Sequence, residues 1–102
     1  MQKKVEEFNR NRRCHKNEMP VYARLLDIQS ESGELAKEYL KNSKYGTENF
    51  VLSDDFLMEY GDTLYALLSL ADELNINAEQ CLDMAIEKYK NRIDKNNTMA
   101  SK

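Results

Sequence analysis

Two pairs of acidic residues with the same spacing lie in the two longest amphipathic segments of the chain. The pairs are Glu31-x-x-Glu34 and Glu59-x-x-Asp62. A glycine directly precedes the second acid of each pair, at Gly33 and Gly61. Because a glycine inside a helix costs about 1 kcal/mol relative to alanine, we expect the helix surface to be kept bare there. Either a closely packed helix or a metal with its substrate would need that bare surface.

The acids align into longer stripes when each segment is drawn as a helix at about 100° per residue. Each stripe spans roughly 60° and borders the apolar side of its helix. The stripes consist of Asp27, Glu31, Glu34 and Glu38 on the first segment and Asp55, Glu59 and Asp62 on the second. Like charges at this spacing repel by a few tenths of a kcal/mol per pair, so a bound cation would relieve that repulsion. We interpret Asp27, Glu38 and Asp55 as supporting or exposed charges.

Carboxylates without histidine or cysteine suit a hard cation such as Mg²⁺ or Mn²⁺. Mg²⁺ often completes its shell with water and substrate phosphates, so the pattern favours phosphate-ester or phosphoanhydride chemistry, in which the metal neutralises developing charge. Positive side chains should lie near such a site. Lys88 and Arg92, one turn apart beside an apolar helix face, are candidate phosphate ligands, although two exposed neighbours on a helix would look the same.

Helical periodicity positions these residues, and it predicts an all-α, four-helix chain. We expect a short helix around Val5 and Phe8, a second from Pro20 to about Lys41, a loop from Asn42 to Leu52, a third from the N-cap Ser53 to about Leu74, and a fourth that Asn77 caps. The pattern predicts one domain over residues 1–94 and a polar, frayed tail over residues 95–102. Cys81 should be a small core residue of the fourth helix. The third helix should bury its apolar residues, which are Phe56, Leu57, Tyr60, Leu64, Leu67, Leu70, Ala71 and Leu74.

Composition excludes several classes of protein. The chain has 102 residues, a net charge of −3 and a pI near 5.2, so it has no global attraction to nucleic acid or to an anionic membrane. No apolar run approaches the roughly 18 residues of a membrane span, and the N-terminus lacks a signal-peptide core. Cys14 and Cys81 are too few for a zinc site or a disulfide framework. We expect a cytoplasmic protein.

A chain of 12.0 kDa covers its apolar surface poorly as a monomer. We therefore expect an obligate oligomer and name Tyr65, Leu68 and Leu74 as candidates for the shared face. The only local basic cluster runs from Arg10 to Lys16. A solvated basic loop explains it more simply than a substrate contact.

Three segments resemble the MazG-like nucleoside triphosphate pyrophosphohydrolases of the all-α type. The segments are Ser30-Glu31-Ser32-Gly33-Glu34-Leu35, Glu59-Tyr60-Gly61-Asp62 and Lys88-Tyr89-Lys90-Asn91-Arg92. The family pattern is Glu-Glu-x-x-Glu, a gap, and Glu-x-x-Asp, followed by a basic stretch on the last helix, and the resemblance covers about residues 19–93. Ser30 stands where that pattern has its first Glu. This chain therefore lacks, at that position, the carboxylate that could bind a second metal or act as a base.

The resemblance implies a Mg²⁺-dependent hydrolase that cleaves nucleoside triphosphates between the α- and β-phosphates, in a helical-bundle dimer or tetramer. It also implies metal ligation by Glu31, Glu34, Glu59 and Asp62, and substrate contacts from Lys88, Asn91 and Arg92. Two alternatives stay open. One is a phosphoribosyl-ATP pyrophosphohydrolase, and the other is a non-catalytic helical module for oligomerisation or partner binding, with the acids as solvated helix faces.

Overall fold

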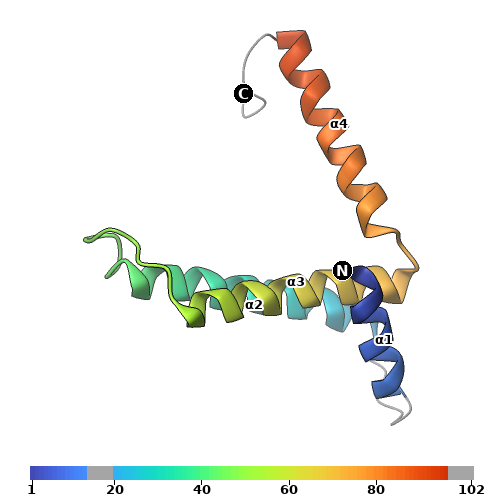
Figure 1. The fold of residues 1–102 in the computed structure, drawn as a ribbon, viewed down its shortest axis with the longest axis horizontal. Coiled ribbons are helices and arrows are strands. Elements are labelled where there is room, and N and C mark those ends of the chain that lie inside the picture. Colours follow the sequence, from blue (N-terminus) through green and yellow to red (C-terminus); the bar gives the residue numbers. More distant parts are fainter. Residues whose placement is uncertain (14–19, 97–102) are drawn as a thin grey trace.

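The structure, a computed structural model, describes residues 1–13 and 20–96. This part of the chain folds into four α-helices and no strands, as the sequence predicts. The helices are α1 (Gln2–Arg13), α2 (Val21–Asn42), α3 (Asp54–Leu74) and α4 (Ala78–Asn96). Helices α2 and α3 form an antiparallel hairpin, α1 crosses α3 near one end of it, and α4 projects away as an arm (Figure 1).

Local capping chemistry sets the helix boundaries. Ser53 precedes α3 in extended conformation, and its hydroxyl accepts a hydrogen bond from the Phe56 backbone N–H at 3.1 Å. The Asn77 side chain accepts the equivalent bond from the Gln80 N–H at 3.0 Å and caps α4. Asn75 ends α3 in the left-handed region with φ 57°, where asparagine is tolerated better than most residues. Both N-caps confirm the sequence predictions.

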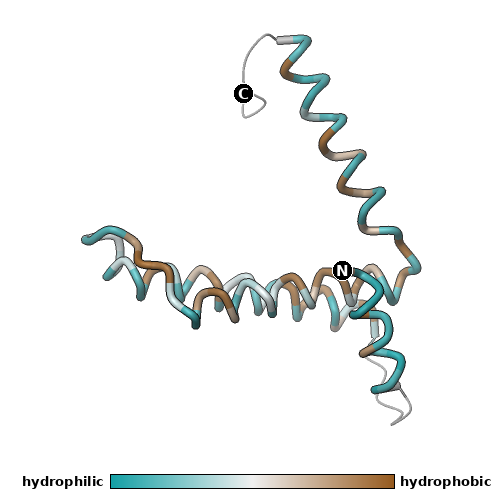
Figure 2. Tube along the Cα trace, in the orientation of Figure 1, coloured by the Kyte–Doolittle hydropathy of each residue, from teal (hydrophilic) through white to brown (hydrophobic). Residues whose placement is uncertain are grey.

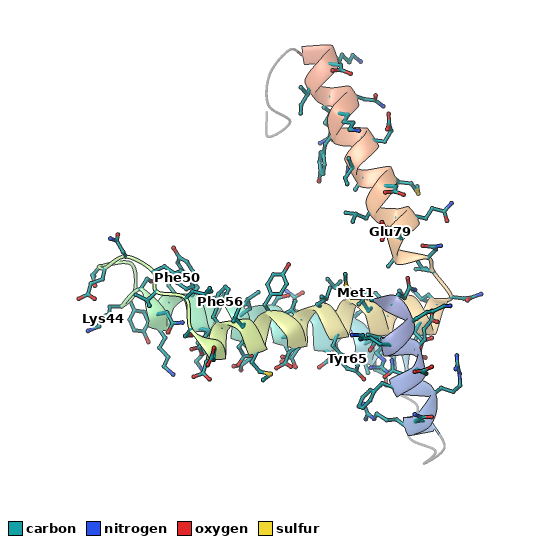
Figure 3. The ribbon with its side chains drawn as sticks, in the orientation of Figure 1. Met1, Lys44, Phe50, Phe56, Tyr65 and Glu79 are labelled. Atoms are coloured by element: carbon teal, nitrogen blue, oxygen red, sulfur yellow. The ribbon has the colours of Figure 1, made fainter. Side chains whose placement is uncertain are left out.

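The loop between α2 and α3 is held by aromatic packing at the closed end of the hairpin. Phe50 stacks on Tyr39 with ring centroids 4.7 Å apart and meets Phe56 edge-on at 5.0 Å (Figure 3). The Asn42 side chain donates to the Ser53 hydroxyl at 2.6 Å and ties the two helix ends together. Gly46 has φ 86°, a conformation that favours glycine. The predicted loop is confirmed.

A polar contact fastens α1 to the hairpin. The Asn9 side chain, 2% exposed, donates to the Ser69 hydroxyl at 3.1 Å and accepts from the Tyr65 hydroxyl at 2.6 Å. Phe8 packs edge-on against the Tyr65 ring at 5.9 Å (Figure 3), and Leu68 is 7% exposed. Leu68 is therefore buried within the chain, whereas Tyr65 is half-buried, and a part for Tyr65 in a shared oligomer face stays a prediction. Leu74 is exposed and stays a candidate.

The predicted burial of α3 and α4 is only partly correct. Of the residues predicted to be buried on α3, Ala71 is buried, and Phe56, Leu64 and Leu70 are half-buried. Ala66 and Leu68 complete the buried side of α3. The other four predicted residues, Leu57, Tyr60, Leu67 and Leu74, are exposed. Cys81 is exposed as well, not a core residue. Cys81 and Leu82 at the start of α4 line a hollow with residues of α3, but the rest of the arm stands apart from the other described helices (Figure 2). The spacing of the apolar residues of α4 correctly predicts a helix but does not reveal that one chain leaves most of this face uncovered.

Two further predictions concern the C-terminal tail and the crossing of a membrane. Lys95 and Asn96 belong to α4, so the helix extends two residues into the predicted tail, and residues 97–102 lie outside the described part of the chain. None of the described helices combines the length and apolarity that crossing a bilayer requires.

Candidate metal centre

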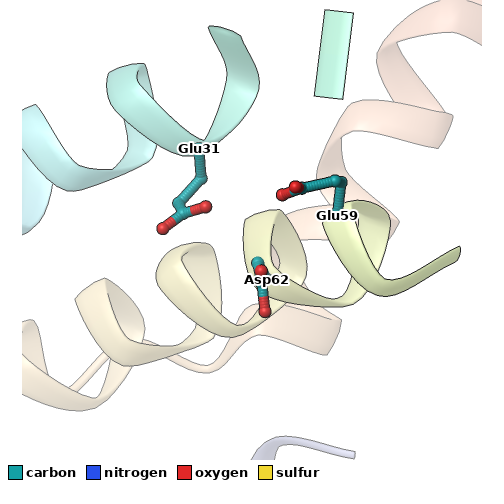
Figure 4. Close-up of side chains that lie close together, drawn as sticks. All are labelled: Glu31, Glu59 and Asp62. Carbon is teal, nitrogen blue, oxygen red and sulfur yellow. The ribbon is translucent and has the colours of Figure 1, made fainter. Parts of the chain in front are cut away.

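Three of the four predicted metal ligands converge in the groove between α2 and α3. Glu31 comes from α2, and Glu59 and Asp62 come from α3 one turn apart. Each offers a carboxylate oxygen, and these oxygens all lie within 4.8 Å of one another (Figure 4). The antiparallel hairpin makes this possible because the middle of α2 lies beside the first half of α3. Glu31 and Glu59 are half-buried and Asp62 is exposed, so the cluster opens to solvent.

Thr63 bridges the two helices directly beneath the acids. Its hydroxyl lies 3.2 Å from the Glu31 carbonyl oxygen on α2 and 3.0 Å from the Glu59 carbonyl oxygen on its own helix. These backbone positions carry two of the three acids, so Thr63 joins the backbone of Glu31 to that of Glu59. The sequence analysis overlooked this residue. Its position in the sequence could have revealed it. Thr63 directly follows Asp62 and lies four residues after Glu59, and at this spacing a threonine in a helix can donate a hydrogen bond to the carbonyl oxygen of the preceding turn.

Partial burial and the crowding of negative charge raise the pKa of two of the acids. The pKa of Glu31 is raised above its ordinary value, first by partial burial and then by the charges of Asp62, Asp27, Glu59 and Glu34. The pKa of Glu59 is raised in the same way, first by partial burial and then by Asp62, Glu34, Glu38 and Asp55. The two stripes therefore act on one another across the groove, and the proton-free cluster carries an electrostatic cost.

The cluster has the donor chemistry that a hard divalent cation requires. In the described part of the chain, no lysine or arginine forms an ion pair with Glu31, Glu59 or Asp62. Oxygens on opposite sides of an octahedral Mg²⁺ lie about 4 Å apart, so small side-chain adjustments would bring all three onto one ion. The residues thus fit Mg²⁺ or Mn²⁺, with room for water or phosphate oxygens on the open side.

Glu34 lies outside this three-residue group. It is exposed on α2, one turn beyond Glu31, and contributes its charge to the raised pKa of Glu59. Asp27, Glu38 and Asp55 likewise act on the cluster through their charge, as expected of supporting residues. A side chain added at Gly33 or Gly61 would meet nothing within 4 Å. No close contact within residues 1–13 and 20–96 therefore requires either glycine.

The predicted substrate-binding residues are not brought to the acids within one chain. Lys88, Asn91 and Arg92 are exposed on the arm α4, which projects away from the hairpin (Figure 1). Lys88 and Arg92 instead flank the Tyr89 ring, with Lys88 Nζ 4.9 Å and Arg92 Cζ 5.8 Å from its centroid. Their contact with a substrate phosphate stays a prediction from the sequence.

The basic cluster is described only in part. Arg12 donates to the Tyr65 hydroxyl at 3.2 Å and lies over the Phe8 ring, so it serves the attachment of α1 to the hairpin. Cys14, His15 and Lys16 lie outside the described residues.

Comparisons of this chain with the models of known protein families, with curated proteins and with solved structures found no match.

Proposed function

We propose that this protein is a Mg²⁺-dependent nucleoside triphosphate pyrophosphohydrolase that produces a nucleoside monophosphate and pyrophosphate. The observation that supports the proposal most is the convergence of Glu31, Glu59 and Asp62 from two helices, with oxygens within 4.8 Å of one another. A solvated helix face gives no reason for acids to gather across a groove, because like charges repel. The resemblance of the sequence segments to the MazG-like enzymes supplies the substrate class.

Bound Mg²⁺ would neutralise the triphosphate and the charge that develops on the leaving pyrophosphate. Glu31, Glu59 and Asp62 would hold the ion from one side and leave its open side to phosphate oxygens and water. Glu34, one turn along α2, would have to turn toward the groove to add a fourth carboxylate. In the reaction, water adds to phosphorus, the bond that joins the α- and β-phosphates through oxygen breaks, and the proton of the water passes to solvent or to a carboxylate.

A non-catalytic helical module is the second candidate, and the uncovered apolar residues of the hairpin and arm favour it. Such surfaces mark interaction sites in many soluble proteins. They are compatible with the enzyme too, because the proposal includes a homodimer or homotetramer. Activity separates the two candidates.

Pyrophosphate release from a panel of nucleoside triphosphates and phosphoribosyl-ATP tests the proposal. We expect release with Mg²⁺ or Mn²⁺ and none with EDTA. Glu59→Gln should abolish it, whereas Glu48→Gln, which removes the same charge from the exposed hairpin loop, should not. Release from phosphoribosyl-ATP alone would select the narrower enzyme, and no release from any substrate would favour the non-catalytic module.

A further inference from the structure

Arg24 of α2 is a buried arginine with too few partners. It is 6% exposed, and its guanidinium has five N–H donors and no acceptor. Within the described residues its charge is paired with Glu73 of α3, at 3.8 Å between Nη2 and Oε1, which is longer than a hydrogen bond of about 2.7–3.2 Å. Among the same residues, the buried Nε–H has no hydrogen-bond acceptor. Since buried polar groups almost always have a partner, Arg24 points to an acceptor that the described chain does not supply.

Arg24 lies in line with the acids of the candidate metal centre. It stands seven residues before Glu31 on α2, so the two residues lie two helical turns apart, about 10.5 Å along the axis and within about 20° of the same face. Both side chains meet α3, Arg24 at Glu73 and Glu31 beside Asp62. The groove between α2 and α3 therefore has acids in its middle and an arginine toward the end that α1 crosses (Figure 1).

A ligand that extends beyond the cation would connect the acids to the arginine. The three linked phosphates of a triphosphate form such a ligand, because a cation on the acids binds some of their oxygens and leaves others free. The free end needs a positive partner along the groove. Asp27, which lies between Arg24 and Glu31 on α2, repels phosphate. Arg24 is the next charged residue on this line and has the opposite sign.

We propose that Arg24 binds the terminal phosphate of the substrate's triphosphate, an inference that rests on the proposed function. The Arg24 side chain turns from Glu73 toward the groove, and its Nε–H and one Nη–H donate to two oxygens of this phosphate. No hydrogen bond to Glu73 has to break, because 3.8 Å is too long for one, and the buried Nε–H gains an acceptor. The planar fork of an arginine matches two phosphate oxygens. The leaving pyrophosphate is then held both by the cation and by Arg24.

The arm and α1 carry other candidate cations, which are less well placed for this role. Lys88 and Arg92 lie on the arm, which projects away from the hairpin within one chain (Figure 1). Arg12 lies where α1 crosses α3, but its Nη1 donates to the Tyr65 hydroxyl at 3.2 Å and so attaches α1 to the hairpin. Arg24 combines burial, an unpartnered N–H and a place on the acid-bearing face of α2.

Calorimetric titration with inorganic tripolyphosphate in the presence of Mg²⁺ tests the inference without a nucleoside. Arg24→Met keeps an apolar stem and removes the donors. It should weaken tripolyphosphate binding about tenfold or more, because charge-assisted hydrogen bonds are lost, and leave the affinity for Mg²⁺ alone within about twofold of the parent. Arg24→Lys keeps the charge without the fork and should fall between the two. Arg12→Met, the same change in the exposed arginine of α1, is the control and should bind tripolyphosphate as the parent does.

Glu73→Gln separates phosphate binding from a structural ion pair. Removal of the acid that competes for Arg24 should tighten tripolyphosphate binding about threefold or more, whereas a structural pair predicts a loss of stability without a gain in affinity. Circular dichroism checks that each variant is folded, and an Arg24→Met protein that does not fold leaves the decision to Arg24→Lys and Glu73→Gln. Tripolyphosphate affinity equal to that of the parent in Arg24→Met, or in Glu73→Gln, would overturn the inference.

The outcomes also separate this inference from the proposed function. A parent that binds tripolyphosphate with Mg²⁺ but hydrolyses no nucleotide, together with the expected loss in Arg24→Met, would end the proposed function and keep Arg24 as a phosphate ligand. Hydrolysis of triphosphates by a parent that binds tripolyphosphate no better than Arg24→Met does would keep the function and remove Arg24 from the site. A parent that binds no tripolyphosphate would overturn the inference.

Discussion

The Thr63 hydroxyl lies 3.2 Å from the Glu31 carbonyl oxygen and so joins the two acid-bearing helices at the level of the candidate site. The same hydroxyl reaches the Glu59 carbonyl oxygen at 3.0 Å. A single side chain therefore links the backbone of one acid on α2 to the backbone of another on α3. This contact joins the two helices at the level of the three carboxylates.

We predict that Thr63→Val lowers the free energy of unfolding by about 1 kcal/mol and weakens Mg²⁺ binding. Valine keeps the shape of threonine, but it removes the only hydroxyl proton that bridges α2 and α3 here. Thr63→Ser keeps the hydroxyl and should retain most of both properties. Urea denaturation and Mg²⁺ titration of the three proteins check this. A valine variant with parental Mg²⁺ affinity would show that the bridge does not position the acids.

A second prediction concerns Mg²⁺ and thermal stability. A ligand that binds only the folded state at about a hundred times its dissociation constant adds roughly 2.7 kcal/mol. The parent should therefore melt several degrees higher in excess Mg²⁺ than in EDTA, and Glu59→Gln should gain little. Glu48→Gln, with the same loss of charge in the exposed loop, should gain as much as the parent. Equal gains in all three proteins would mean that Mg²⁺ acts elsewhere.

The raised pKa of Glu31 predicts how the stability of the metal-free protein depends on pH. A carboxyl whose folded-state pKa exceeds its ordinary value of 4.5 holds its proton more tightly when folded. Its contribution is favourable below pH 4.5 and is lost as the pH rises through the raised value. In EDTA at neutral pH, Glu31→Gln should thus be more stable than the parent, and the difference should vanish as the pH falls toward 4.5.

Denaturation midpoints of the parent, Glu31→Gln and Glu87→Gln across this pH range provide the test. Glu87 is an exposed acid on the arm, outside the cluster, so its variant should follow the parent. A difference between the parent and Glu31→Gln that stays constant with pH would contradict the role of charge crowding at Glu31.

The position of the arm yields a fourth prediction. If Arg92 contacts a substrate phosphate, as the sequence predicts, Arg92→Ala should lower kcat/KM for a triphosphate tenfold or more, since charge-assisted hydrogen bonds contribute about 1.5–3 kcal/mol. Because α4 projects away from the hairpin within one chain (Figure 1), such a loss would require another copy to deliver Arg92 to the acids. Steady-state kinetics provide the test. A kcat/KM within about twofold of the parent would remove Arg92 from the site.

Helix positions could be predicted from the sequence because their signals are local. Ser53 and Asn77 cap helices whatever surrounds them, and the apolar period of α3 is unmistakable. Whether an apolar face is covered is not local. Leu57 and Tyr60 share a face with Leu64, as the period requires, yet nothing in the sequence says that this face is open in one chain. That outcome depends on the direction of α4. Two residues far apart in sequence set this direction together: Asn75, whose backbone is in the left-handed region, and Gln2, whose side chain donates a hydrogen bond to the Ile76 carbonyl oxygen.

The candidate site, too, could be predicted from the sequence only in part. The i,i+3 spacing predicts that Glu59 and Asp62 share a helix surface, and the pairing of two acidic stripes predicts that Glu31 joins them. The side on which Glu34 lies depends on how far α2 is rotated against α3, which packing of the buried residues decides. The same spacing therefore gives one converging acid and one exposed acid on α2.

The last prediction follows from this difference between Glu31 and Glu34. Glu34 is exposed and outside the group whose oxygens lie within 4.8 Å, so it acts as a ligand only after its side chain turns into the groove. Loss of groups that support a metal from outside its immediate ligands typically costs 10- to 100-fold in affinity or activity. Glu34→Gln should therefore lower pyrophosphate release by about tenfold and keep part of the Mg²⁺-induced gain in melting temperature, whereas Glu59→Gln should lose both almost completely. Rate measurements and melting curves on the two variants, each with EDTA and with excess Mg²⁺, separate the roles. Complete and equal losses in both variants would show that Glu34 is an equal ligand, and an unaffected Glu34→Gln protein would show that three carboxylates suffice.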